Sequence, residues 1–283
     1  MEIKTVINDK LNKLLEVETD DKYTVEAVYY RGDTLCISTQ LGCPVRCSFC
    51  ASGKEGLIRN LSDREIILQY ELAILDGLEI SNIAFAGIGE PLLNWENTKK
   101  AFNYFKEKGL KCSFYTTGFP TKNFEELLEI NHNGITLSLH AVYEEKRKKL
   151  IPYGEPIEKI LDIFKKHLDK LSNRKRKQYS VGYLLIKDVN DTEEELEKLA
   201  EISKWLGVGV SLLKYNEIEG IPYKTTSDED YEKAFLKLKS LGVRTTLSNR
   251  YRTRKIGGCG TLMINRLTEK NNWKMEIKFV PFF

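Results

Sequence analysis

Three cysteines, Cys43, Cys47 and Cys50, stand close together in the pattern C-x3-C-x2-C. Thiolates at this spacing can wrap one face of a [4Fe–4S] cube and leave one iron without a protein ligand. Zinc is the alternative, but a structural zinc site takes a closed set of four ligands. Cys36 is a candidate fourth ligand, although it lies within the preceding predicted strand. The spacing favours the cluster.

The elements that must position these cysteines alternate between strand and helix. Amphipathic helices are predicted over residues 62–76, 156–171, 192–206 and 228–241, the first opened by a capping box of Ser62 and Glu65 and the third by Thr192 and Glu195. Apolar, β-rich runs predict strands over residues 34–40, 82–87, 112–117, 135–140, 179–186, 209–215 and 244–248.

This alternation predicts an α/β fold with a mostly parallel sheet, because short connections through helices join parallel strands. Six or seven units suit a partial (β/α)6 TIM-like barrel, and an open doubly wound sheet is the structural alternative. We expect a short N-terminal β extension over residues 1–33, the barrel over residues 34–262 and a C-terminal tail over residues 263–283.

Polar and glycine residues recur where the predicted strands end, while the strand bodies stay apolar. The cysteine motif follows the first strand, and similar segments follow the next five: residues 87–91, 116–118, 138–140, 187–188 and 215–216. Since the carboxyl ends of parallel strands meet at one edge of a sheet, this layout predicts an active site there.

The motif after a first strand resembles the signature of the radical S-adenosylmethionine (SAM) enzymes. Within that superfamily, the chain is similar to the RNA adenine-methylating family that includes RlmN and Cfr. The similarity runs in order from about Val25 to Leu262, and it is carried by residues 31–43, 59–61, 87–94, 137–141, 188–191 and 259–260.

The resemblance implies a role for each matching residue. Cys43, Cys47 and Cys50 match the cluster ligands, and Cys259 matches the cysteine that is itself methylated. Cys36 matches the cysteine that later forms a disulfide with the methylated cysteine, Cys259. Glu26 matches the general base. The SAM-binding segments of the family match Gly89, Glu90, Tyr115, Ser138, Leu139, His140 and Asn216.

The implied chemistry is a methyl transfer to an sp2 carbon of adenine, carbon 2 in preference to carbon 8, through methylated Cys259. The implied cofactors are a [4Fe–4S] cluster and SAM, with a one-electron reductant such as flavodoxin or ferredoxin. The same chemistry on a small molecule or protein is an alternative, and so is a non-catalytic RNA-binding module that holds a metal or a cluster.

The sequence departs from the family pattern in three places. Tyr115 stands where the family has a small hydroxyl residue, and residues 252–259 form a shorter loop before Cys259. The family usually carries a separate N-terminal RNA-binding domain, and the 35 residues before Cys36 are too few for one. We therefore expect RNA, a tRNA or an rRNA, as the substrate, and the missing domain favours an accessible target such as a tRNA or an isolated RNA loop over a large folded rRNA.

Several other residues carry weaker signals. Cys112 has no motif partner and is expected in the core, whereas His132 and His167 are expected at the surface. Residues 174–177 are basic and are expected to form a solvated loop. Residues 244–255 hold five basic side chains and no acid, which suits phosphate contacts beside Cys259.

Composition limits the remaining possibilities. The chain has 283 residues, of which 41% are hydrophobic, and its formal net charge is +3. That content suffices for a core, and the small charge excludes a global polybasic surface. No apolar run approaches the 18 or so residues that span a bilayer, and the N-terminus lacks a secretory pattern. We therefore expect a monomeric, cytoplasmic protein without a membrane partner.

Overall fold

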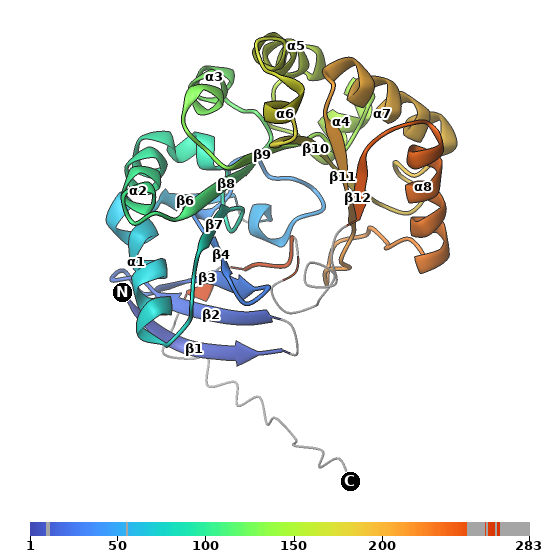
Figure 1. Ribbon diagram of the computed structural model, residues 1–283. Helices are drawn as coiled ribbons and strands as arrows, with labels where there is room; N and C mark the ends of the chain where they lie inside the picture. Colours follow the sequence, from blue (N-terminus) through green and yellow to red (C-terminus); the bar gives the residue numbers. More distant parts are fainter. Residues whose placement is uncertain (10–11, 55, 248–257, 259, 264, 267–283) are drawn as a thin grey trace.

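A computed structural model of the chain describes residues 1–9, 12–54, 56–247, 258, 260–263 and 265–266 (Figure 1). Within this part, one eleven-stranded sheet runs in the order β1-β2-β3-β4-β7-β8-β9-β10-β11-β12, with β13 paired to β3. The strands of this sheet are β1 (Glu2–Asn8), β2 (Asn12–Glu18), β3 (Tyr23–Tyr30), β4 (Thr34–Ile37), β7 (Asn82–Phe85), β8 (Lys111–Thr116), β9 (Gly134–Ser138), β10 (Tyr179–Leu185), β11 (Gly209–Lys214), β12 (Thr245–Leu247) and β13 (Asn265–Arg266).

Helices fill the connections between the parallel strands. The α-helices are α1 (Asp63–Leu75), α2 (Trp95–Glu107), α3 (Thr121–Glu129), α4 (Glu144–Leu150), α5 (Ile157–Leu168), α6 (Asn173–Arg176), α7 (Glu193–Leu206) and α8 (Asp228–Ser240). Two 3-10 helices, η1 (Ala51–Gly53) and η2 (Pro91–Asn94), and a small antiparallel pair, β5 (Gln40–Gly42) and β6 (Leu57–Asn60), lie in the first two connections.

From β4 to β12 every neighbouring pair of strands is parallel, and the strands follow one another in chain order. A doubly wound sheet would reverse its strand order at a switch point, and this sheet does not. Figure 1 shows the helices along the outside of the curved sheet. The predicted α/β partial barrel is confirmed, and the doubly wound alternative is wrong.

Strands β1 to β3 form the predicted N-terminal extension. They are antiparallel to one another, and β3 pairs antiparallel with β4 through Val28 and Cys36, so the extension belongs to the same sheet. The cross-strand pairing puts Val28 and Cys36 on one face, because directly opposite residues point the same way. The extension thereby brings its own side chains to the carboxyl ends of the barrel strands.

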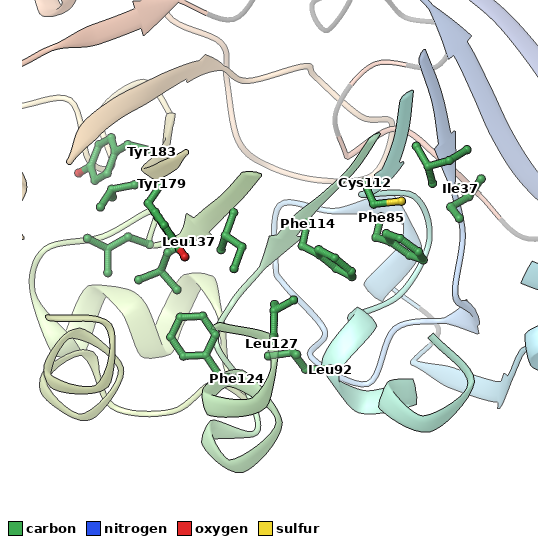
Figure 2. Close-up of a cluster of buried hydrophobic side chains, with 14 of the residues drawn as sticks. Ile37, Phe85, Leu92, Cys112, Phe114, Phe124, Leu127, Leu137, Tyr179 and Tyr183 are labelled. Carbon is green, nitrogen blue, oxygen red and sulfur yellow. The ribbon is translucent and has the colours of Figure 1, made fainter. Parts of the chain in front are cut away.

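Successive side chains on each strand point to opposite faces of the sheet, so one face forms the core and the other faces the site. Phe114 and Phe85 stack with ring centroids 4.5 Å apart, in the buried cluster under the helices that Figure 2 shows. Cys112 lies in this cluster and is fully buried, which confirms its predicted core position. Tyr115, one residue beyond Phe114, lies on the opposite face, because successive strand residues point to opposite sides.

The expectation that His132 and His167 lie at the surface is wrong. Both side chains are buried, and each ring places its Nε2 atom within about 3 Å of the Tyr179 hydroxyl, at 3.0 and 2.9 Å. His167 Nδ1 lies 3.2 Å from a Glu129 carboxylate oxygen, which can only accept, so this nitrogen is the donor. Tyr179 is 12 residues or more away in sequence, so no local pattern signals this cluster.

Of the two predicted capping boxes, the one at Ser62 is confirmed in full. Ser62 accepts a hydrogen bond from Glu65 N, and the Glu65 carboxylate accepts one from Ser62 N. At α7, Thr192 accepts from Glu195 N, and the Glu195 carboxylate accepts from the Thr192 hydroxyl at 3.3 Å and lies 2.8 Å from Lys146. Among the described residues no helix combines the length and apolar character needed to cross a membrane.

Candidate active site

The cysteine motif forms a compact loop after β5. Gly42 begins it with a φ of +83°, and a Cβ at this position would lie 1.9 Å from the Gly56 carbonyl oxygen, so no other residue fits. Cys43 N donates to that same oxygen at 3.1 Å. Turns follow in which Arg46 N donates to the Cys43 carbonyl and Cys50 N donates to the Cys47 carbonyl. These bonds hold the three cysteines in one short stretch of fixed backbone.

Apolar side chains surround the loop. Val45, Phe49, Ala141, Leu184 and other residues form a buried cluster against which Cys43, Cys47 and Cys50 pack. Burial raises the pKa of the Cys43 thiol to about 12 and that of Cys47 well above its usual value. Both thiols therefore ionise only when bound metal offsets the cost of burying their charge.

The donor set fits a cluster better than a single ion. Cys43, Cys47 and Cys50 give three thiols from one short loop, whereas a closed structural zinc site takes four protein ligands. In a cube each cysteine binds a different iron, so its ligands need not converge on one point. Zinc would need such convergence.

A cavity of about 200 Å³ opens beside the loop, at the carboxyl ends of β4 and β7 to β11. It brings together most of the residues that the sequence predicted for the site, since its walls include Cys36, Cys43, Cys47, Cys50, Gly89, Glu90, Tyr115, Ser138 and His140. Leu139 and Asn216 are not among the described residues that line it, although Tyr215 is. The Leu139 side chain is buried in the core instead.

Glu90 uses its carboxylate to tie two strand ends together. It accepts hydrogen bonds from Thr116 Oγ1 at 2.6 Å, Thr117 N at 2.8 Å and Thr117 Oγ1 at 2.9 Å. Burial raises the pKa of Glu90, and these donors oppose that effect. Because the carboxylate is already bonded to β8, Glu90 shapes the cavity wall as well as lining it.

His140 lies in the left-handed region, with a φ of +58°, at the end of β9. Its Nδ1 accepts a hydrogen bond from Leu184 N at 3.1 Å, so the proton of the neutral ring sits on Nε2. Burial, reinforced by the charge of Arg147, lowers the pKa of His140 to about 3. The ring is therefore neutral at physiological pH and offers one N–H donor.

Glu26 lies on β3 two residues before Val28, which lines the cavity, and therefore on the same face of the strand. Its carboxylate is buried and accepts a hydrogen bond from Met263 N at 2.9 Å. Burial raises the pKa of Glu26 to about 7, and Glu16, directly opposite on β2, contributes in the same direction. Glu26 is not among the described cavity-lining residues, but it joins the extension to the C-terminal segment.

Cys259 lies outside the described residues. Its neighbours Gly258 and Gly260 line the cavity together with Cys36 and the cysteine loop. The Gly260 carbonyl accepts a hydrogen bond from Ala51 N at 2.9 Å, one residue beyond Cys50. The described residues on either side of Cys259 thus belong to the cavity wall.

Several supporting residues escaped sequence reasoning. Gln40 accepts from Glu90 N at 2.9 Å through its side chain, and Ser38 donates from its hydroxyl to the Glu26 carbonyl at 2.7 Å. Arg147 is buried behind the cavity wall and donates to the Leu139 carbonyl. Ser38 and Gln40 lie at the end of the strand predicted over residues 34–40. Their polar side chains in an otherwise apolar run could have indicated a role at the site. Arg147 sits in a charged helix that carries no such signal.

A curved parallel sheet with a C-x3-C-x2-C loop at its strand ends defines a radical SAM enzyme, and residues 37–201 match the Radical SAM superfamily. A probable dual-specificity RNA methyltransferase RlmN of Dictyoglomus thermophilum is 34% identical over 277 residues, which cover 92% of this chain and 78% of that protein. Another protein of that name, from Pseudothermotoga lettingae, is 37% identical over 223 residues, 74% of this chain and 63% of its own.

The crystal structure of a radical SAM methyltransferase from Sphaerobacter thermophilus superposes with a TM-score of 0.83 at 26% identity, covering 92% of this chain and 80% of that one. The chain belongs to the RlmN family of radical SAM methyltransferases. The cofactors of this class are a [4Fe–4S] cluster and SAM.

Proposed function

We propose that this enzyme methylates carbon 2 of an adenine in RNA by way of a methylated Cys259. The observation that carries the proposal is one cavity lined by Cys36, the cysteine loop and the two glycines that flank Cys259. The RlmN-type names of the relatives support RNA as the substrate class. The preference for carbon 2 over carbon 8 rests on family resemblance.

The proposed cluster ligands are Cys43, Cys47 and Cys50, whose thiols sit in an apolar surround. When bound, the cluster and SAM supply one-electron chemistry that removes hydrogen from an unreactive carbon. A partner such as flavodoxin or ferredoxin would deliver the electron. The chain's own contribution is to keep water away from this region with Val45, Phe49 and Leu184.

The proposed SAM-binding residues surround the same cavity. Gly89 has a φ of +105°, and a Cβ there would lie 2.7 Å from the Gln40 side chain, so glycine lets the backbone come close. Ser138 offers a hydroxyl and neutral His140 offers an N–H donor from the end of β9. Gly89 and Glu90 would bind the amino group, and Tyr115, Leu139 and Asn216 are proposed to complete the site.

Glu26 is the proposed general base. A base works best when its pKa lies near the working pH, and burial brings the pKa of Glu26 to about 7. It would take the proton from the adenine carbon that receives the methyl group. Its position beside Val28 puts it on the cavity face of β3.

Cys259 and Cys36 are the proposed pair of reacting cysteines. Cys259 would accept on sulfur a methyl group from one SAM molecule, and this group, after losing one hydrogen atom, would bond to the adenine carbon. Cys36 would then attack the Cys259 sulfur, which breaks the bond between that sulfur and the bridging carbon. A disulfide forms between the two cysteines, and the bridging carbon takes up a proton as the methylated base leaves. Cys36 lines the cavity from β4, opposite Val28.

The basic segment 244–255 remains a proposed RNA contact. Only its first four residues, 244–247, are described. The base to be modified must leave its stack to reach a cavity at the strand ends, and an unpaired base does so at least cost. A tRNA or an isolated RNA loop is therefore the substrate proposed.

The test incubates the anaerobically reconstituted enzyme with SAM labelled in the methyl group, a reductant and RNA, followed by digestion to nucleosides. We expect label in 2-methyladenosine, and none with Cys259→Ala. Label in 8-methyladenosine would correct the position. If RNA stays unlabelled while a protein or small molecule is labelled in a Cys259-dependent way, the RNA substrate is wrong.

The cluster ligands are tested separately. Cys43→Ala, Cys47→Ala and Cys50→Ala should each lose cluster absorbance and deoxyadenosine formation, whereas Cys112→Ala, in the core away from the cavity, should retain both. Deoxyadenosine formation by any of the first three variants would contradict the assignment. Cys36→Ala should stop with RNA covalently held, and normal multiple turnover would reduce Cys36 to a packing role.

A further inference from the structure

Arg147, on α4, is 1% exposed and is the largest fully buried side chain that the structure describes. Its guanidinium donates to three backbone carbonyls at the carboxyl ends of two strands. The acceptors are Thr117 O at 3.0 Å, Ser138 O at 3.2 Å and Leu139 O at 2.5 Å. Thr117 and Ser138 both line the cavity, so Arg147 supports its wall from behind.

No carboxylate in the described part of the chain lies within 4.0 Å of Arg147, although its neighbours on α4 have such partners. Lys146 pairs with Glu195 at 2.8 Å and Lys148 with Glu144 at 3.8 Å. Arg147 Nε is buried without a hydrogen-bond partner among the described residues. Arginine stays protonated in proteins, so the helix buries one full positive charge.

Such a charge is costly to bury unless an anion offsets it, and carbonyl dipoles offset it only in part. The carboxylates that act on Arg147 are Glu144 and Glu90, and neither forms an ion pair with it. Glu90 is engaged by Thr116 and Thr117, and Glu144 accepts from Ile157 N. Neither carboxylate therefore pairs with the guanidinium, which stays available to an anion bound beside the cavity wall that it supports.

Helix α4 is attached directly to the cysteine loop. The Leu150 carbonyl, at its last turn, accepts a hydrogen bond from Ser48 N at 3.0 Å, one residue after Cys47. Leu150 and Ile151 also belong to the apolar cluster around the three cysteines. The position of Arg147 relative to the loop is thus fixed by packing and by a backbone bond.

We propose that Arg147 is a positioning residue that provides the buried counter-charge of the iron–sulfur cluster and raises its reduction potential. The inference rests on the proposed binding of the cluster by Cys43, Cys47 and Cys50. Three thiolates give the bound cluster a net negative charge, which grows when it accepts an electron. A fixed positive charge in an apolar surround favours the reduced form. The same guanidinium holds the carbonyls of Thr117, Ser138 and Leu139, so electron uptake and the shape of the cavity depend on one side chain.

The test compares Arg147→Gln, which removes the charge, with Arg147→Lys, which keeps it. Lys149→Met is the matched control, because Lys149 is an exposed cation on the same helix. The readout is the cluster midpoint potential from an anaerobic redox titration followed by electron paramagnetic resonance, with iron per chain measured in parallel. We expect a more negative potential for Arg147→Gln and the wild-type potential for Arg147→Lys and Lys149→Met.

An Arg147→Gln protein with full iron content and the wild-type potential would overturn the proposal. Arg147 would then serve only to hydrogen-bond the backbone carbonyls behind the cavity. If Arg147→Gln does not fold, Arg147→Met decides by the same measurement: a more negative potential supports the counter-charge, and the wild-type potential overturns it. A wild-type protein that takes up no cluster would instead contradict the proposed function, so the two failures are distinguishable.

Discussion

The Ser52 hydroxyl donates a 2.7 Å hydrogen bond to the Leu262 carbonyl, across 210 residues of sequence. Both residues are buried, and both line the cavity. One residue earlier, Ala51 N donates to the Gly260 carbonyl. Two short segments, one directly after Cys50 and one directly after Cys259, are therefore fixed to each other at the site.

Ser52→Ala should loosen this junction. The Leu262 carbonyl would lose its partner in a buried setting, which costs about 1–3 kcal/mol. We expect a lower free energy of unfolding in urea and methyl transfer that falls more than deoxyadenosine formation, because the cluster ligands are untouched. Ser240→Ala, which removes an exposed hydroxyl bonded within its own helix, should change neither quantity. Equal losses of both reactions would show that Ser52 supports the cluster loop alone.

Gly42→Ala should abolish cluster binding. The added Cβ would meet the Gly56 carbonyl at 1.9 Å, and backbone cannot move away as a side-chain end can. Gly32→Ala is the matched control, because Gly32 also has a positive φ, +77°, but nothing lies within 4 Å of its Cβ position. Gly32→Ala should cost only about 1–2 kcal/mol of stability, the penalty for an L-residue in the left-handed region. Iron and sulfide per chain after anaerobic reconstitution measure the difference, and full cluster content in Gly42→Ala would contradict the geometry.

Glu26→Gln should remove part of the pH dependence of stability. Burial raises the pKa of Glu26 from 4.5 to about 7, so the folded protein holds a proton that the unfolded chain releases. The wild-type free energy of unfolding should therefore fall between about pH 4.5 and pH 7, by up to roughly 3 kcal/mol, relative to the variant. Gln keeps an acceptor for Met263 N.

Urea denaturation at pH 5 and pH 8 measures this difference, with the exposed Glu125→Gln as the control. Parallel pH profiles for the wild type and Glu26→Gln would show that Glu26 titrates normally. Glu16→Gln should weaken the effect, because Glu16 stands opposite Glu26 and raises its pKa.

Tyr179→Phe should destabilise the fold without disturbing the chemistry. Its hydroxyl is the shared partner of His132 and His167, and its loss leaves two buried rings unsatisfied, at a cost of about 1–3 kcal/mol each. Tyr153→Phe is the control, since Tyr153 is 56% exposed. Urea denaturation reports the loss, while iron content should match the wild type. Loss of the cluster in Tyr179→Phe would mean that this network reaches the site.

Local patterns predicted much of the architecture. The seven parallel strands and four of the helices follow from alternation and helical periodicity, which depend on nearby residues alone. Helices α2 and α3 were not among those named from the sequence. The sequence misplaced His132 and His167 because their shared hydrogen-bond partner, Tyr179, lies on β10, outside the segments that carry them.

The sequence by itself determined the chemistry: the C-x3-C-x2-C spacing predicts a cluster, and polar residues at successive strand ends predict a site there. Only the tertiary structure decided which groups work together. Pairing of β3 with β4 puts Glu26 and Cys36 on one face, burial brings the pKa of Glu26 to about 7, and α4 buries Arg147 behind Ser138. Burial, register and long-range hydrogen bonds depend on residues far apart in the chain, and a linear pattern does not contain them.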